Sequence, residues 1–276
     1  MGRISTTRTA ATATAAVAAL GVVVLVLLVA GPHRPPTERE ARAVGPAQAP
    51  PDLRVLSGLL DGRTPATWVF TGDSITQGST HTHGRRSFTE HFTERVRGEL
   101  GRASDVVINT GVSGDRTGDV LAGFAGRVLR FDPDAVVVML GTNDSVAGKE
   151  GRDRFRESLG TIVERIRDSG ATPVLQTPNP VDTGGSPRHW DLAGYVDIVR
   201  DLARRREVVL VDHYAHWLSV GDGRPPGSWL SDPVHPNGRG HLEMARMLFE
   251  HLRILDPTTP TGRARWGARG MGTGTT

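Results

Sequence analysis

Short apolar runs alternate with longer amphipathic segments through the middle of this 276-residue chain. Five runs are rich in β-branched or other apolar residues, as is typical of strands buried on both faces of a sheet: Thr67 to Thr71, Asp105 to Asn109, Ala135 to Leu140, Thr172 to Gln176 and Val208 to Val211. Three intervening segments repeat apolar residues at helical spacing: Ser87 to Leu100, Arg152 to Asp168 and Tyr195 to Arg206. This alternation predicts a three-layer α/β/α sandwich with a mostly parallel five-stranded sheet.

The two ends of the chain differ in composition from this middle part. We expect an N-terminal membrane anchor or signal segment over residues 1–31 and a Pro-rich linker over residues 32–51. A single globular domain is expected over residues 52–257. Residues 258–276 are rich in Gly, Thr and Arg, which is typical of a flexible tail.

The N-terminal segment has a membrane-targeting pattern. Arg3 and Arg8 precede an uncharged stretch with an apolar core from Val17 to Ala30. A helix of about 20 such residues can span a bilayer, and the flanking arginines favour a cytoplasmic N-terminus. No small-x-small site closes the apolar run, so we expect an uncleaved single-pass anchor with the globular domain outside the cytoplasm. Cleavage and secretion remain the alternative.

The overall charge argues against a nucleic-acid partner. The chain has 33 Lys plus Arg against 30 Asp plus Glu, a formal net charge of +3, and its arginines are scattered along the predicted helices. It contains no Cys, which excludes disulfides, thiolate metal sites and a cysteine nucleophile. The oligomeric state does not follow from these features.

Ser74 lies where the first predicted strand ends. Thr71-Gly72-Asp73-Ser74 directly follows Trp68-Val69-Phe70, and Gly72 permits a tight turn there. In a parallel sheet flanked by helices, the ligand site lies beyond the carboxyl ends of the strands, so this is a plausible position for a nucleophile. The segment lacks the Gly-x-Ser-x-Gly pattern of the α/β-hydrolase elbow, and an isolated Gly-Asp-Ser triplet often only caps a helix.

Two further segments follow predicted strands and a third stands near the end of the domain: Asn109-Thr110-Gly111-Val112-Ser113-Gly114-Asp115, Gly141-Thr142-Asn143-Asp144 and Asp232-Pro233-Val234-His235. Together with Gly72-Asp73-Ser74, they resemble in order the four blocks of the SGNH (GDSL-type) hydrolase superfamily of serine esterases and lipases. The resemblance covers Val69 to Leu252. It implies a flavodoxin-like fold and an ester hydrolase that needs no metal or organic cofactor.

The resemblance also implies roles for particular residues. Ser74 would be the nucleophile, His235 its general base and Asp232 the carboxylate that orients the imidazole, a division of labour that suits their chemistry. The implied oxyanion hole consists of the backbone N–H groups of Ser74 and Gly114 and the side-chain amide of Asn143. Gly111 remains an alternative to Gly114.

Several neighbouring polar residues invite other interpretations. Asp73 and Asp144 flank the implied site, and we interpret them as turn and hydrogen-bonding residues. His81 and His83 could bind zinc, but the sequence offers no clear third ligand. We therefore expect their loop to face substrate or solvent, and we expect no metal site.

Asp212 and His213 form a second candidate pair after the fifth predicted strand. Adjacent residues on an extended strand point to opposite faces, so we do not expect them to act together. Five aromatic residues could line a substrate pocket or belong to the core, and the sequence does not distinguish these: Trp190, Tyr195, Tyr214, Trp217 and Trp229.

The predicted function is an extracytoplasmic serine esterase that hydrolyses carboxylic esters, acetyl esters among them, through an acyl-enzyme. Placement outside the cytoplasm favours acylated carbohydrate over a lipid as the substrate, and the absence of a long apolar lid-like insertion disfavours a dedicated lipase. A lipase or lysophospholipase is the alternative within the same chemistry, and acyl transfer to an alcohol is a further one. A non-catalytic glycan-binding or envelope-scaffold protein is the alternative of another class.

Overall fold

The computed structural model describes residues 50–263 of the chain. The predicted anchor or signal segment, the linker up to residue 49 and residues 264–276 lie outside the described residues. Between residues 50 and 263, no helix is both long and apolar enough to cross a membrane.

Five strands in the described part form one sheet, and every neighbouring pair is parallel. They are β1 (Thr67–Gly72), β2 (Val106–Asn109), β3 (Ala135–Met139), β4 (Thr172–Gln176) and β5 (Val209–Val211). Their spatial order, β2-β1-β3-β4-β5, is that of flavodoxin-like folds. The order reverses between β1 and β3, and ligands bind at such a switch point, beyond the carboxyl ends of the strands.

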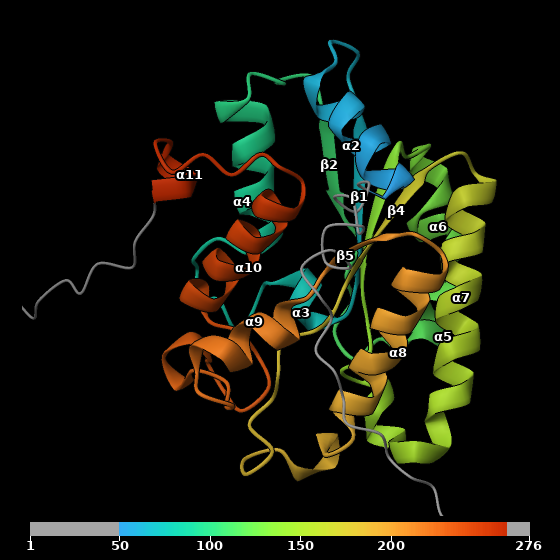
Figure 1. Ribbon diagram of the computed structural model, residues 1–276, viewed down its shortest axis with the longest axis vertical. Helices are drawn as coiled ribbons and strands as arrows, with labels where there is room; N and C mark the ends of the chain where they lie inside the picture. The colour runs from blue at the N-terminus through green and yellow to red at the C-terminus, as the bar shows by residue number, and fades with distance from the viewer. Residues whose placement is uncertain (1–49, 264–276) are drawn as a thin grey trace, which may run out of the picture. The chain divides into compact units, whose positions relative to one another are not determined.

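Helices cover both faces of this sheet (Figure 1). One face packs against α2 (Pro51–Asp61), α4 (Phe88–Thr93), α9 (His213–Val220) and α10 (Gly238–His251). The other packs against α5 (Thr117–Ala122), α6 (Phe124–Arg127), α7 (Arg152–Asp168) and α8 (Leu192–Arg205). The predicted α/β/α sandwich is therefore confirmed.

Alternation along the strands divides the core into two apolar clusters. Trp68 and Phe70 of β1 belong to the cluster beneath α4 and α10, whereas Val69 belongs to the cluster beneath α7 and α8. Successive side chains of a strand point to opposite faces, which is why one short apolar run supplies both clusters. The edge strand β2 differs from the expectation of two buried faces, since Val106 is 47% exposed.

The predicted helices form close to their expected bounds. Ser87 begins the first one with a capping box, in which its hydroxyl accepts from Glu90 N and the Glu90 carboxylate accepts from Ser87 N. This helix then continues as a π-helical segment, η1 (Glu94–Glu99). The helix expected from Tyr195 begins earlier, at Leu192, whose side chain is buried.

The folded unit extends past the expected domain boundary at residue 257. The helix α11 (Pro260–Arg263) belongs to it, and Thr261 is only 3% exposed. Thr261 N donates to Glu99 Oε1 at 2.7 Å. The composition of residues 258–276 did not indicate this contact, because it joins two residues that lie far apart in the sequence.

Short 3-10 helices complete the described elements: η2 (Leu129–Phe131), η3 (Asp144–Gly151), η4 (Pro187–His189) and η5 (Gly227–Trp229). Of these, η3 follows β3, and η4 lies between β4 and α8. Both segments therefore follow the carboxyl ends of central strands, where the implied site residues also lie.

Candidate active site

The short helix α3 (Ser74–Gln77) presents Ser74 immediately beyond β1. Asp73 caps this helix, because its Oδ1 accepts from Ile75 N at 2.9 Å. Ser74 is the first helical residue, so its N–H has no acceptor within the helix. Gly72 is required at the turn, since a Cβ there would lie 2.4 Å from the carbonyl oxygen of Met139. The local sequence thus places Ser74, which is partly exposed, beyond the strand and leaves its N–H without an acceptor in the helix.

The structure brings Ser74, His235 and Asp232 into one hydrogen-bonded chain. Ser74 Oγ lies 3.0 Å from His235 Nε2. On the other side of the ring, His235 Nδ1 lies 2.8 Å from Asp232 Oδ2 and 3.0 Å from Oδ1. Because the carboxylate can only accept, Nδ1 carries the hydrogen and the Nε2 lone pair faces the serine hydroxyl. This is the arrangement needed to remove a proton from Ser74.

The loop that carries Asp232 folds back on itself. Asp232 Oδ1 accepts from Val234 N at 2.8 Å and from His235 N at 2.9 Å. Burial acts to raise the pKa of this carboxyl, but the hydrogen bonds from Val234 N, His235 N and the His235 ring outweigh it, and the pKa lies below its ordinary value. Asp232 therefore remains an anion through the neutral range.

Gly114 and Asn143 come from the loops after β2 and β3. Gly114 adopts a φ of +87°, and its N–H has no acceptor within residues 50–263. Asn143 Nδ2 donates to the carbonyl oxygen of Asp115 at 3.0 Å, which links the two loops. The alternative, Gly111, already donates its N–H to Asn109 Oδ1 at 2.9 Å. Gly114 is thus the glycine with a free donor.

Asp73 and Asp144 are buried hydrogen-bonding residues, as interpreted from the sequence. Asp144 Oδ1 accepts from Thr117 N at 3.0 Å and from Thr117 Oγ1 at 2.7 Å. Burial raises the pKa of Asp144, and burial raises the pKa of Asp73 to about 7. Neither carboxyl forms part of the chain through His235.

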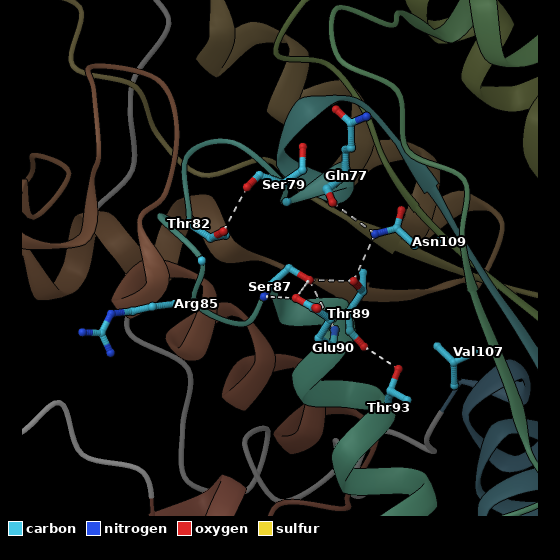
Figure 2. Close-up of a pocket in the computed structure, with 12 residues that line it drawn as sticks. Gln77, Ser79, Thr82, Arg85, Ser87, Thr89, Glu90, Thr93, Val107 and Asn109 are labelled. Atoms are coloured by element: carbon cyan, nitrogen blue, oxygen red, sulfur yellow. Dashed lines mark hydrogen bonds between the residues drawn. The ribbon is translucent and has the colours of Figure 1, made fainter.

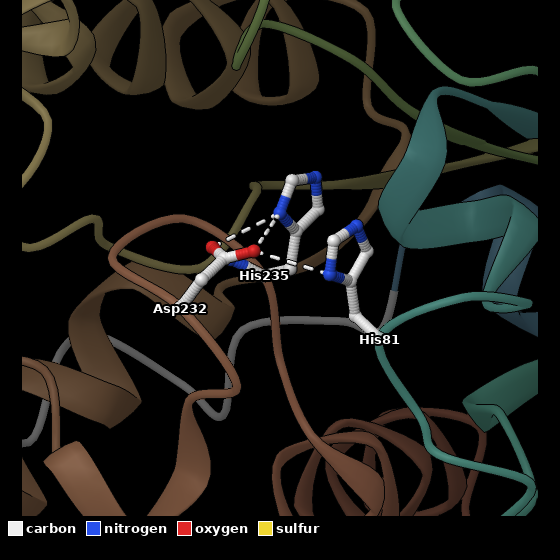
Figure 3. A group of neighbouring side chains, drawn as sticks. All are labelled: His81, Asp232 and His235. Carbon is white, nitrogen blue, oxygen red and sulfur yellow. Dashed lines mark hydrogen bonds and ion pairs between the residues drawn. The ribbon is translucent and has the colours of Figure 1, made fainter.

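Sequence reasoning missed the position of His81. Its Nδ1 lies 3.1 Å from Asp232 Oδ2, and its ring stacks on the His235 ring with a centroid separation of 3.6 Å and an interplanar angle of 2° (Figure 3). Potential ligand atoms of His81, Asp232 and His235 all lie within 4.8 Å of one another. The neighbouring His83 contacts Ser231 Oγ instead, through Nε2 at 2.8 Å. The His-x-His motif a few residues after Ser74 was the available signal.

Asp212 and His213, the second candidate pair, make contacts that stabilise the fold. Asp212 caps α9 by accepting from Ala215 N and forms an ion pair with Arg200 at 2.7 Å. His213 is fully buried, and its Nε2 lies 2.9 Å from Gln176 Oε1. The two side chains have different partners, as expected, but not because they lie on an extended strand: β5 ends at Val211, Asp212 caps α9 and His213 is its first residue.

The five aromatic residues also separate in the structure. Tyr195, Trp217 and Trp229 are buried in the core, and Tyr214 is partly buried. Trp190, which follows η4, is 58% exposed. Only Trp190 among these five offers most of its ring to a ligand.

Two hollows flank the segments that carry the site residues. The first is lined by polar residues at the end of α3 and just after it, among them Gln77, Ser79 and Thr82 (Figure 2). Asn109 also lines this hollow, and its side-chain amide donates to the Thr76 carbonyl oxygen and to Thr89 Oγ1. The second has a volume of about 640 Å³ and is lined by Gly114 and by charged side chains, including Arg116, Asp119, Glu150 and Arg154.

Known proteins resemble this chain in both sequence and fold. The model of the GDSL-like lipase/acylhydrolase family matches residues 70–242. The chain is 28% identical over 222 residues to the uncharacterized lipoprotein YqeF of Bacillus subtilis (strain 168), a match that covers 70% of this chain and 90% of that protein. It is 27% identical over 202 residues to an acetylxylan esterase of Geobacillus stearothermophilus, covering 67% and 92% respectively.

The solved structures agree on the fold. A crystal structure of a variant of an acetylxylan esterase from Geobacillus stearothermophilus matches with a TM-score of 0.57 and 22% identity. The match covers 74% of this chain and all of the other.

Proposed function

Because the chain belongs to the GDSL-like lipase/acylhydrolase family within the SGNH superfamily and is a serine carboxylic ester hydrolase, we propose that it removes acetyl groups from acylated carbohydrate. The reaction would pass through an acyl-enzyme on Ser74. The observation that carries this proposal is the chain from Ser74 Oγ through the His235 ring to Asp232.

In the first half of the reaction, Ser74 Oγ transfers its proton to His235 Nε2 and attacks the ester carbonyl carbon. Asp232 stabilises the imidazolium that forms. His235 then gives the proton to the leaving sugar oxygen as the carbon–oxygen bond breaks, which leaves the acyl group on Ser74. In the second half, His235 takes a proton from water, the resulting attack releases the acid, and the proton returns to Ser74 Oγ.

The tetrahedral intermediates carry a negative oxygen that needs donors. The N–H groups of Ser74 and Gly114 and the second Nδ2 hydrogen of Asn143 supply them in this proposal. Two features of the structure support the assignment: Ser74 N lies at the start of α3, and Gly114 N has no acceptor among the described residues. Such preorganised donors stabilise the developing charge without reorganisation.

The hollow beside Gly114 supports a hydrophilic substrate. Its wall carries Arg116, Asp119, Glu150 and Arg154 beside Ala147 and Phe155, so the hydroxyl groups of a sugar would find hydrogen-bonding partners there. A relative described as an acetylxylan esterase supports the same substrate class. The lipase alternative predicts instead a preference for long acyl chains.

The decisive experiment is hydrolysis by the full chain of a series of chromogenic esters, from acetyl to octanoyl, followed by acetylated xylo-oligosaccharides. Ser74→Ala should lower kcat by at least about a thousandfold, because the nucleophile is lost. The matched variant Ser79→Ala, at an exposed serine on the same segment, should keep wild-type activity. Turnover that survives Ser74→Ala would refute the nucleophile assignment, and binding without turnover by the wild type would favour the non-catalytic alternative.

We extend the proposal to location: the esterase domain lies outside the cytoplasm, held by the N-terminal segment. The apolar run from Val17 to Ala30 after Arg3 and Arg8 supports this. External protease added to intact cells should digest the domain. Protection of the domain, under conditions in which a known external protein is cut, would contradict the proposed location.

A further inference from the structure

We propose that His81 is a positioning residue for the esterase reaction, holding the plane of the His235 ring by stacking and sharing the Asp232 carboxylate with it. The inference rests on the proposed function, since it assigns His235 as the base. It concerns a residue on the segment between α3 and α4, remote in sequence from the loop of Asp232 and His235.

The contacts of Asp232 divide between its two oxygens. Oδ1 accepts from Val234 N and His235 N, which fixes the carboxylate on its own loop, and it also lies 3.0 Å from His235 Nδ1. Oδ2 lies 2.8 Å from His235 Nδ1 and 3.1 Å from His81 Nδ1. Because an ionised carboxylate only accepts, both imidazoles carry their hydrogen on Nδ1. His81 is therefore a second donor to the group that orients the base.

Stacking by His81 restricts a tilt of the His235 ring that the hydrogen bonds to Asp232 do not prevent. Hydrogen bonding at Nδ1 alone leaves the imidazole free to tilt about that atom, and a tilt would move Nε2 away from Ser74 Oγ. The parallel His81 ring, 3.6 Å away by centroid, occupies one face of His235 and opposes such a tilt. It also keeps water from that face. The 3.0 Å contact between Ser74 Oγ and His235 Nε2 depends on this orientation.

The His81 loop is itself anchored to the loop of Asp232. His83 Nε2 contacts Ser231 Oγ at 2.8 Å, and Ser231 N donates to the His235 carbonyl oxygen at 2.8 Å. Thr82, between the two histidines, is buried and donates to the Ser79 carbonyl oxygen. These contacts fix the backbone of the segment that carries His81, so the position of the His81 ring does not depend on stacking alone.

The same three side chains could be read as a metal site, but the ring planes argue against it. The lone pair of an imidazole nitrogen lies in the plane of its ring. The His81 and His235 planes are parallel and separated, so a metal ion in the plane of one ring would lie well out of the plane of the other. Two N–H donors that converge on one carboxylate oxygen account for the observed arrangement.

The charges around His235 give His81 a measurable effect. Asp232 faces the ring from its own loop, and three other imidazoles lie near it: His81, His189 after β4 and His241 of α10. Burial lowers the pKa of all three, that of His241 to about 3, so they are neutral at neutral pH. Removing His81 leaves Asp232 Oδ2 to His235 alone and opens one face of the His235 ring to water, and both changes favour a positive charge on that ring.

The test is kcat and KM of the full chain for an acetyl ester across the pH range. His81→Ala should lower kcat about tenfold with little change in KM, as expected when a group that orients a catalytic side chain is removed. The acid limb of kcat/KM should move to higher pH, because only the neutral base is active. His81→Phe, which keeps a ring but loses the donor, should recover most of kcat while the acid limb stays shifted.

The control is Thr80→Ala, at an exposed side chain next to His81 that contacts neither the His235 ring nor the loop of Asp232. It should leave the acid limb where it is in the wild type. The proposal is overturned if His81→Ala keeps wild-type kcat and pH dependence, or if kcat falls while the acid limb does not move. Activity in Ser74→Ala, measured in parallel, would instead refute the proposed function, so the two failures are distinguishable.

Discussion

Asn143 makes a structural contact beside the oxyanion role that we propose for it. An amide nitrogen carries two hydrogens. One of them reaches the carbonyl oxygen of Asp115, on the loop that also presents Gly114. This contact sets the orientation of the amide, and in the reaction that we propose the second hydrogen is the one that the oxyanion accepts. The donor is therefore held in place before substrate arrives, which is what makes such groups effective.

We expect Asn143→Ala to lower kcat by about a hundred- to a thousandfold, because a preorganised oxyanion donor is lost. KM should change much less, since the donor acts mainly in the transition state. Steady-state kinetics with an acetyl ester would measure both constants, and thermal unfolding would verify that the variant is folded. A variant with wild-type kcat would exclude Asn143 from the oxyanion hole.

At the scale of elements, the C-terminal helix α11 is joined to η1 through Glu99. Thr261 N and Oγ1 both donate to the Glu99 carboxylate, and Arg95 Nη1 donates to it at 3.0 Å. Arg95 is buried, and its Nε donates to the Ile254 carbonyl oxygen. A buried ion pair therefore closes this end of the domain.

We expect Glu99→Ala to lower the free energy of unfolding by about 3–5 kcal/mol, because it leaves a buried guanidinium without its anionic partner. Asp153→Ala removes the partner of Arg156 in a pair whose carboxylate side chain is 96% exposed, and it should cost less than about 1 kcal/mol. Urea unfolding of both variants would measure the difference. Equal losses would show that Glu99 does not stabilise the C-terminal segment as described.

For the whole molecule, buried titratable groups couple stability to pH in opposite directions. Burial lowers the pKa of His213 and of His241 to about 3 and that of His91 to about 4. The folded state excludes protons that the unfolded chain binds below pH 6.5, so acid destabilises the fold through these histidines. Asp73 acts oppositely, because its pKa is raised to about 7 and the folded state retains its proton longer.

We expect Asp73→Asn to stabilise the protein relative to wild type at pH 8, by a few kcal/mol at roughly 1.4 kcal/mol per pKa unit. The gain should shrink as pH falls from 7 toward 4, where wild-type Asp73 is also neutral. The amide oxygen can still accept from Ile75 N. Denaturant unfolding of both proteins at pH 4.5 and pH 8 would measure this, and a difference that does not vary with pH would contradict the raised pKa.

Much of the fold was predictable because its information is local. Buried parallel strands appear as apolar runs, and helices show apolar spacing with a charged opposite face. The edge position of β2 was not predictable, since its composition matches that of the buried strands. The choice between Gly111 and Gly114 also depended on a contact, as only the structure shows that Gly111 N is already bonded to Asn109 Oδ1.

The sequence by itself determined the alternation of strands and helices, the turn that exposes Ser74 and the four segments that resemble the SGNH hydrolases. Each depends on residues adjacent along the chain. Only the tertiary structure decided three contacts: the His81 ring stacks on the His235 ring, Asp144 accepts hydrogen bonds from Thr117, and Thr261 donates to Glu99. These contacts join residues from different loops and layers, and their distances follow from how the helices pack on the sheet rather than from any local pattern.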